Sequence, residues 1–278
     1  MPRPITRKLL TSNALAAVTL TGIAASAQAA TVEYRNDNAL TINNNNGVNG
    51  QVTVIPVPAG RTPVQTLELP GVKPFWSSGG TDLEMFLVGP NGDQMHVMIT
   101  GCATMGNTTN FTITDNATAF AESSIAFCNN ELVGGKGKPK DNDGKTFASF
   151  FGGKASGGNW TLHVRDIGVQ AGGGTFSGWG LRITHAPLVP TIVAKKQPLG
   201  KSLRFMATCN ADCALTTGGD TKAKTEQLNQ GNTEALKAKL KAKARDRLEE
   251  KGKAKLKVTV DDGYGDVVTE TVKVKLKR

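Results

Sequence analysis

The chain has 278 residues, of which 38% are hydrophobic and 5% aromatic, and it carries a formal net charge of +10. This length allows one large domain or two modest ones, and a core with so few aromatic side chains must be filled by Val, Leu, Ile and Ala. The 32 glycines, set among short alternating apolar segments, favour an all-β chain and argue against a helical one.

The N-terminus has the pattern of a secretory signal peptide. Three basic residues precede a mostly apolar stretch from Leu9 to Ala25, and Ala27-Gln28-Ala29 places small residues at the two positions that signal peptidase reads. A membrane anchor is the alternative, but Thr, Ser and Asn interrupt the apolar stretch. We therefore predict that residues 1–29 are removed, that no segment spans a membrane, and that the protein is secreted, with retention at the cell surface as a variant of this address.

Composition divides the remaining chain into segments. Residues 30–49 are predicted to be an Asn-rich lead-in without core-forming residues, and residues 50–186 a first β-domain. Residues 187–191 contain two prolines and are predicted to be a linker. Residues 192–278 form a second, basic domain.

The first domain is predicted to contain short strands separated by turns. Val52 to Val57 alternates as a strand does, and Asp82–Val88 and His96–Ile99 are predicted to pair across a Pro90-Asn91-Gly92-Asp93 turn. In the segment Asn159–Asp166, apolar and polar residues alternate, which places Trp160 on the buried face. Strands of this length and spacing predict a β-sandwich.

Three motifs in this domain resemble those of the P domain, or Homo B domain, which follows the catalytic domain in kexin- and furin-like serine endopeptidases. In chain order they are Thr81–Gly92, then Phe151–Gly153 with Gly158–Asp166, and finally Gly174–Leu181. Two positions depart from the family pattern: Phe176 stands where Leu is usual, and Thr81 stands where Gly precedes the aspartate. The resemblance covers about residues 50–186 and implies a jelly-roll-like β-sandwich.

The resemblance also implies a function without catalysis. P domains support the folding, stability, and pH or calcium response of an adjoining protease, so a secreted protease is the expected partner. His96, His163 and His185 lie outside any His-Gly-Thr context, and no Gly-Thr-Ser nucleophile turn is present, so no serine-protease triad is recognisable. Two alternatives remain open: a cell-surface adhesion or structural protein, and a serine endopeptidase system with an unrecognised hydrolase centre.

Three aspartates are candidates for a structural calcium site. Asp82, Asp115 and Asp166 lie at strand ends or in the motifs of the family, and carboxylates that converge at one end of a sandwich can hold Ca²⁺. The alternative is that each aspartate caps a turn. No other cofactor is expected.

Four cysteines suit a secreted protein with disulfides. Cys209 and Cys213 are assigned to a small local loop, which leaves Cys102 to pair with Cys128. This is one of three connectivities that four cysteines allow. Zinc is the weaker alternative, because the closely spaced pair has no second pair of ligands nearby.

The basic charge belongs to the C-terminal region, where residues 191–278 contain 20 basic and 11 acidic residues. Lysines alternate with Ala or Leu near residues 237–241 and again near residues 253–257, which places them on the solvent face of strands. Such a face is either simply solvated or attracted to an anionic cell-envelope polymer. Nucleic acid is not expected, because no aromatic residues interleave with the lysines.

The same region loosely resembles the Ig-like β-domains appended to bacterial secreted proteins. The Asp261-Asp262-Gly263 turn between two β-branched segments predicts a terminal hairpin. Residues 242–250 favour a short helix, while residues 236–240 fit either a strand or the start of a longer helix.

Overall fold

Two hydrophobic cores form from consecutive stretches of the chain in the computed structural model, which describes residues 29–42, 50–76, 83–99, 110–118, 135–166 and 174–277. The first core contains residues from Ile42 to Ile183 and the second residues from Leu188 to Leu276. Almost all regular structure in the described residues is β-strand, which confirms the predicted all-β class. The predicted signal peptide lies outside these residues, apart from its last position.

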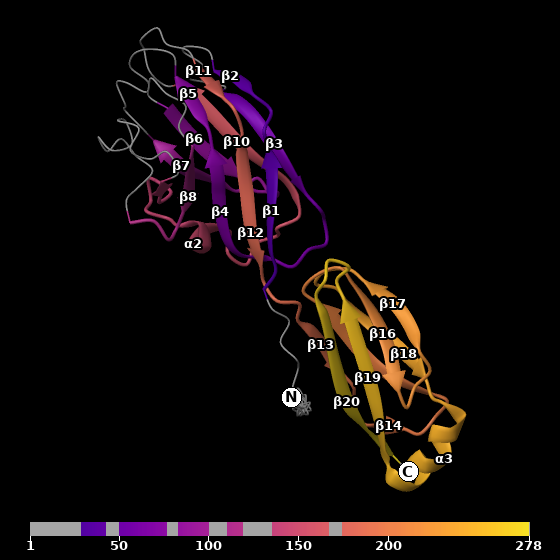
Figure 1. The fold of residues 1–278 in the computed structure, drawn as a ribbon. Helices are drawn as coiled ribbons and strands as arrows, with labels where there is room; N and C mark the ends of the chain where they lie inside the picture. Colours follow the sequence, from indigo (N-terminus) through magenta and orange to yellow (C-terminus); the bar gives the residue numbers. More distant parts are fainter. Residues whose placement is uncertain are drawn as a thin grey trace, which may run out of the picture.

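Three sheets surround the first core. The five-stranded sheet has the order β1-β12-β4-β8-β9, formed by Thr31–Asn36, Trp179–His185, Val64–Val72, Phe111–Thr114 and Lys136–Gly137. The four-stranded sheet has the order β3-β10-β6-β7, formed by Gln51–Val57, Gly158–Asp166, Leu83–Val88 and Gln94–Ile99. A small sheet, β2-β11-β5, is formed by Leu40–Ile42, Gly174–Phe176 and Pro74–Trp76. Figure 1 shows these strands grouped as one domain.

The four-stranded sheet follows the sequence pattern closely. β6 and β7 pair antiparallel as the predicted hairpin, and Leu83, Met85 and Leu87 of β6 are fully buried. On β10, Trp160 is buried, and its indole N–H donates to the carbonyl of Ser156 at 2.7 Å. Alternating apolar residues therefore face the first core and leave the intervening residues on an outer face.

The predicted lead-in differs from the structure. Residues 31–36 form β1, which pairs antiparallel along its whole length with β12, and Ile42 in β2 is 1% exposed within the first core. β1 lies at the edge of its sheet and has no fully buried residue, so most of its side chains are polar. This composition is the reason that the strand was not predicted. Part of the predicted lead-in, residues 43–49, lies outside the described residues.

A short helix, α2 (Phe147–Phe151), packs against the first domain with Phe147 and Phe151 buried. Thr146 and Ser149 form a capping box at its start, with reciprocal hydrogen bonds between their side chains and backbone N–H groups. This helix is not among the elements that the sequence predicts.

Two sheets surround the second core. The three-stranded sheet β13-β15-β18 is formed by Pro190–Val193, Ser202–Cys209 and Thr233–Lys239. The five-stranded sheet β14-β20-β19-β16-β17 is formed by Gln197–Pro198, Val267–Lys277, Lys253–Asp261, Cys213–Gly219 and Lys224–Leu228. β19 and β20 pair antiparallel around the Asp-Gly turn, as the sequence predicts.

The structure resolves the ambiguity near residue 240. β18 ends at Lys239, and α3 (Ala242–Lys251) follows and ends at Gly252, whose φ of 62° is the left-handed value that glycine adopts at a helix C-terminus. The predicted linker is part of the second domain, because Leu188 lies in its core and β13 begins at Pro190. Figure 1 shows α3 beside the C-terminus, at the end of this domain far from the first one.

Candidate functional site

A row of side chains crosses the outer face of the four-stranded sheet. The antiparallel registers place His163 of β10 directly between Val52 of β3 and Phe86 of β6, and place His96 of β7 next to Phe86. The His163 ring stacks on Phe86 with centroids 4.4 Å apart and planes 17° apart, and the His96 ring lies 5.9 Å from Phe86. We call seven of the outward residues of these strands the outer face. They are Val52, Val54, Glu84, Phe86, His96, His163 and Arg165, and they border the polar outward residues Asn159 and Thr161 of β10.

Glu84 anchors one end of this row. Its side chain is only 7% exposed and accepts a hydrogen bond from Arg165 Nε, while His96 Nδ1 lies 3.2 Å from its other oxygen. The Arg165 guanidinium also lies 5.7 Å from the centre of the Phe86 ring. A nearly buried carboxylate is stable only with such partners, so this cluster holds Arg165 and His96 in place around Phe86.

The electrostatics of the outer face favour a neutral imidazole at His163. Burial lowers the pKa of His163 below its ordinary value of 6.5. Val52 is 44% exposed and Val54 is 37% exposed on the neighbouring strand. The face therefore offers aliphatic and aromatic area bordered by one guanidinium, a mixture typical of protein-binding surfaces.

The structure gives each of the three histidines a defined neighbour. His96 faces Glu84 and His163 stacks on Phe86, while Nδ1 of the buried His185 lies 3.1 Å from the carbonyl of Thr62. Burial lowers the pKa of His185, and the hydrogen bond to that carbonyl opposes the effect. A triad requires a hydroxyl hydrogen-bonded to the imidazole, and in the described part of the chain no histidine has one.

The predicted calcium ligands are not seen together. Asp115 accepts hydrogen bonds from the backbone N–H groups of Phe147 and Ala148, both at 2.8 Å, so it caps α2. Asp166 is fully buried at the end of β10. Asp82 lies outside the described residues, and the described residues contain no group of three or more acidic, histidine or cysteine side chains arranged to hold a metal ion. Calcium binding stays a prediction.

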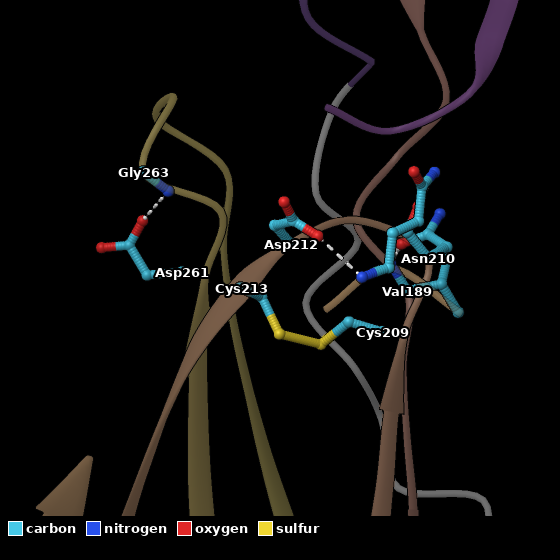
Figure 2. Close-up of a disulfide and its surroundings, with 8 residues drawn as sticks. Val189, Cys209, Asn210, Asp212, Cys213, Asp261 and Gly263 are labelled. Atoms are coloured by element: carbon cyan, nitrogen blue, oxygen red, sulfur yellow. Dashed lines mark hydrogen bonds between the residues drawn. A yellow bond between two sulfur atoms is a disulfide. The ribbon is translucent and has the colours of Figure 1, made fainter. Parts of the chain in front are cut away.

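Cys209 and Cys213 form the predicted local disulfide, with their Cα atoms 6.6 Å apart (Figure 2). Cys102 and Cys128 lie outside the described residues. Within the disulfide loop, the side chain of Asn210 accepts from the backbone N–H of Val189 at 2.7 Å, and the backbone N–H of Asp212 donates to the carbonyl of Gly60 at 2.8 Å. The loop therefore contacts both the connecting segment and the first domain.

The terminal hairpin also reaches the first domain. The Tyr264 hydroxyl donates to the carbonyl of Ala59 at 3.0 Å, and the guanidinium of Arg61 lies 4.2 Å above the Tyr264 ring. Asp261 and Asp262, which start this turn, accept backbone hydrogen bonds from Gly263 and Tyr264. These carboxylates therefore shape the turn.

Sequence reasoning located some of these residues but not their grouping. The alternation that buries Trp160 puts His163 on the other side of β10. His96 falls in the predicted hairpin, whose register alone would place it near Phe86. The contact between His163 and Phe86 depends on pairing between β10 and β6, which are far apart in sequence.

No helix in the described residues is long and apolar enough to cross a membrane.

Comparisons with known proteins give distant structural matches. A complex of a serine protease from Aeromonas sobria with its chaperone ORF2 matches at 15% identity and a TM-score of 0.29, over 56% of this chain and 27% of that one. The adhesin domain of Epf from Streptococcus pyogenes matches at 9% identity and a TM-score of 0.29, over 86% of this chain and 76% of that one. The present chain thus spans little more than a quarter of the chain that it matches in that complex. No curated protein matches.

The sequence itself gives a more specific match. Residues 129–183 match the family model of the proprotein convertase P-domain. The matched stretch contains β10, with His163 and Arg165 on its outer side, and most of β12 with the buried Trp179. This part of the chain is therefore similar to the P domain, as the motifs in the sequence predicted.

Proposed function

We propose that this chain is a secreted, non-catalytic module that binds and stabilises a serine-type protease. The P-domain match over residues 129–183 carries the proposal, because in proprotein convertases this domain accompanies the catalytic domain without catalysing the reaction itself. The disulfide between Cys209 and Cys213 supports an extracellular address, since such bonds persist in oxidising compartments.

The outer face is the surface that we propose for the protease. It combines the stacked rings of Phe86 and His163 with the exposed valines Val52 and Val54. Aromatic residues and arginine are enriched where proteins bind one another, and Arg165 stands at the border of this apolar area. The ion pair between Arg165 and Glu84 fixes these side chains before binding, which lowers the entropic cost of association.

The test is affinity capture with the mature chain, residues 30–278, from the secreted fraction of its own source. We expect a serine-type protease to be recovered, and recovery in calcium and in chelator would show whether binding needs the ion. Val54→Glu should abolish recovery because it places a charge on the outer face. Val193→Glu is the matched control, since Val193 is 49% exposed on the second domain.

Two outcomes would contradict the proposal. Equal recovery by the two variants would exclude the outer face as the docking surface. Recovery of envelope polymer alone, released by high salt, would make the chain an adhesion protein and remove the protease from its function.

A further inference from the structure

Six lysines share one side of the terminal hairpin. Lys253, Lys255 and Lys257 lie on β19, and Lys273, Lys275 and Lys277 lie on β20, all with exposed side chains that alternate with residues packed toward the second core. We call these six residues the lysine face. Because side chains on one face of a strand repeat about every 6.8 Å, the face presents a dense grid of positive charge.

The register brings like charges directly opposite one another. Lys253 pairs with Lys275, and Lys255 pairs with Lys273. Like charges in directly opposed positions destabilise an antiparallel pair. Among the described residues, none of the six lysines makes an ion pair, and the nearby Asp220 carboxylate is occupied by Arg247 and by the backbone N–H of Lys255. The arrangement therefore costs stability, and no close ion pair among the described residues offsets it.

Protection of a sheet edge does not explain this arrangement. Lysines on exposed edge strands discourage edge-to-edge aggregation, and this could account for β20, because the short β14 covers only its end. β19, however, pairs with β16 from Leu256 to Asp261, which covers the edge at Lys257, and Asp220 hydrogen-bonds to both backbone groups of Lys255. Edge protection therefore does not account for Lys255 and Lys257, which need a different reason.

The composition of the face indicates what kind of ligand would fit. The other outward positions of the paired strands include Thr259, Thr269 and Thr271, and no aromatic ring lies among them on which a nucleic-acid base could stack. Lysine ammonium groups act as point charges and do not impose the planar geometry that arginine does. A flexible chain with closely spaced phosphate or carboxylate groups can follow such a grid.

We propose that the lysine face binds a linear anionic polymer of the cell envelope and so retains the secreted protein at the cell surface. Charge complementarity carries the proposal, and it does not depend on the protease partner. Retention through the second domain would leave the outer face of the first domain available.

A second basic region provides the matched control. A groove beside the three-stranded sheet is lined by Lys195, Gln197, Lys201, Arg204 and Lys237, among others. Arg204 and Lys237 are direct neighbours across β15 and β18. The groove is lined by β15 and β18 of the three-stranded sheet and by Gln197 and Pro198 of β14. The three charges to be removed, on Lys195, Arg204 and Lys237, lie outside the lysine face, so their removal changes the net charge equally and leaves that face intact.

The experiment measures binding of the mature chain to inorganic polyphosphate and to a polyuronate as probes, over a range of salt concentrations. The variant K253Q/K255Q/K273Q is compared with K195Q/R204Q/K237Q and with K253R/K255R/K273R. We expect the first variant to lose at least about tenfold in affinity for the polymer. The slope of log affinity against log salt concentration should become shallower by about three, because each lysine contact releases about one counterion. The arginine variant should bind like the parent chain.

Several results would overturn the proposal. One is a loss of affinity in K195Q/R204Q/K237Q that equals or exceeds the loss in K253Q/K255Q/K273Q. A second is unchanged affinity in K253Q/K255Q/K273Q, which we call the glutamine variant. A third is tighter binding of the parent chain to single-stranded DNA of equal charge than to either polymer. A thermal melt of each variant verifies folding, and the glutamine variant should melt no lower than the parent. Protease capture by the glutamine variant should be unchanged, which separates failure of this inference from failure of the proposed function.

Discussion

At the scale of single residues, the histidine on the outer face links stability to pH. Burial lowers the pKa of His163 in the folded protein below the value of 6.5 expected after unfolding. The neutral ring therefore contributes stability that is fully present above pH 6.5 and is lost as the pH falls from there through the lower, folded-state pKa.

His163→Phe should keep the stack on Phe86 and remove this titration. We expect the melting temperature of the variant to fall less than that of the parent between pH 7 and pH 5, as measured by circular dichroism. Burial also lowers the pKa of His185. Because His185 is present in both proteins, it contributes equally to both melting curves. Parallel curves for the two proteins would show that His163 titrates normally.

Asp115 is a second residue whose contribution to stability can be measured. Its two oxygens accept the first backbone N–H groups of α2, so Asp115→Ala should cost about 0.5–2 kcal/mol of unfolding free energy in urea denaturation, the range for loss of a helix cap. Asp115→Asn keeps an acceptor and should cost less. If the alanine variant were less stable than the parent only when calcium was present, Asp115 would act as a metal ligand. The hydrogen bonds to α2 would then contribute little to stability.

At the scale of strands, the opposed lysines predict a gain in stability on removal of charge. Lys253→Gln removes the repulsion with Lys275 and should stabilise the protein by about 0.2–1 kcal/mol at low salt. The gain should shrink in high salt, where exposed charges are screened. Lys196→Gln is the control, because this exposed lysine lies in the connection between β13 and β14 and faces no paired lysine. Equal effects of the two substitutions would mean that only net charge matters.

The strands also show what could be predicted from sequence. The hairpins of β6 with β7 and of β19 with β20 followed from local alternation and turn residues. β1 was not predicted in this way, because its alternation is short: only Val32 and Tyr34 are apolar, and both are half-buried. The row through His163 and Phe86 could not be predicted either, because it depends on pairing between distant strands.

At the scale of the whole molecule, the two domains meet at a small polar junction. Gly60 of the first domain accepts a hydrogen bond from Asp212 in the disulfide loop, and its φ of 78° is a left-handed value that other residues rarely adopt. A Cβ at this position would lie 2.3 Å from a carboxylate oxygen of Asp212. Tyr264 and Arg61 form the second half of the junction through their stacked contact.

These contacts predict how thermal unfolding depends on the junction. Each domain has its own core, so each can melt separately once the junction is weakened. Gly60→Ala combined with Tyr264→Ala should therefore separate the calorimetric trace into two transitions further apart than in the parent chain. Tyr264→Phe removes only the hydrogen bond to Ala59 and should have a smaller effect, of about 1 kcal/mol.

Small-angle scattering supplies an independent measure of the same junction. The double variant should show a larger maximum dimension. Without the junction contacts, only the short connection after His185 restrains the two domains relative to each other. Gly263→Ala offers a control in the same hairpin, since a Cβ there has no neighbour within 4 Å although its φ of 74° adds local strain. If the double variant and the control gave the same trace and the same dimensions, the junction would contribute nothing to the coupling of the domains.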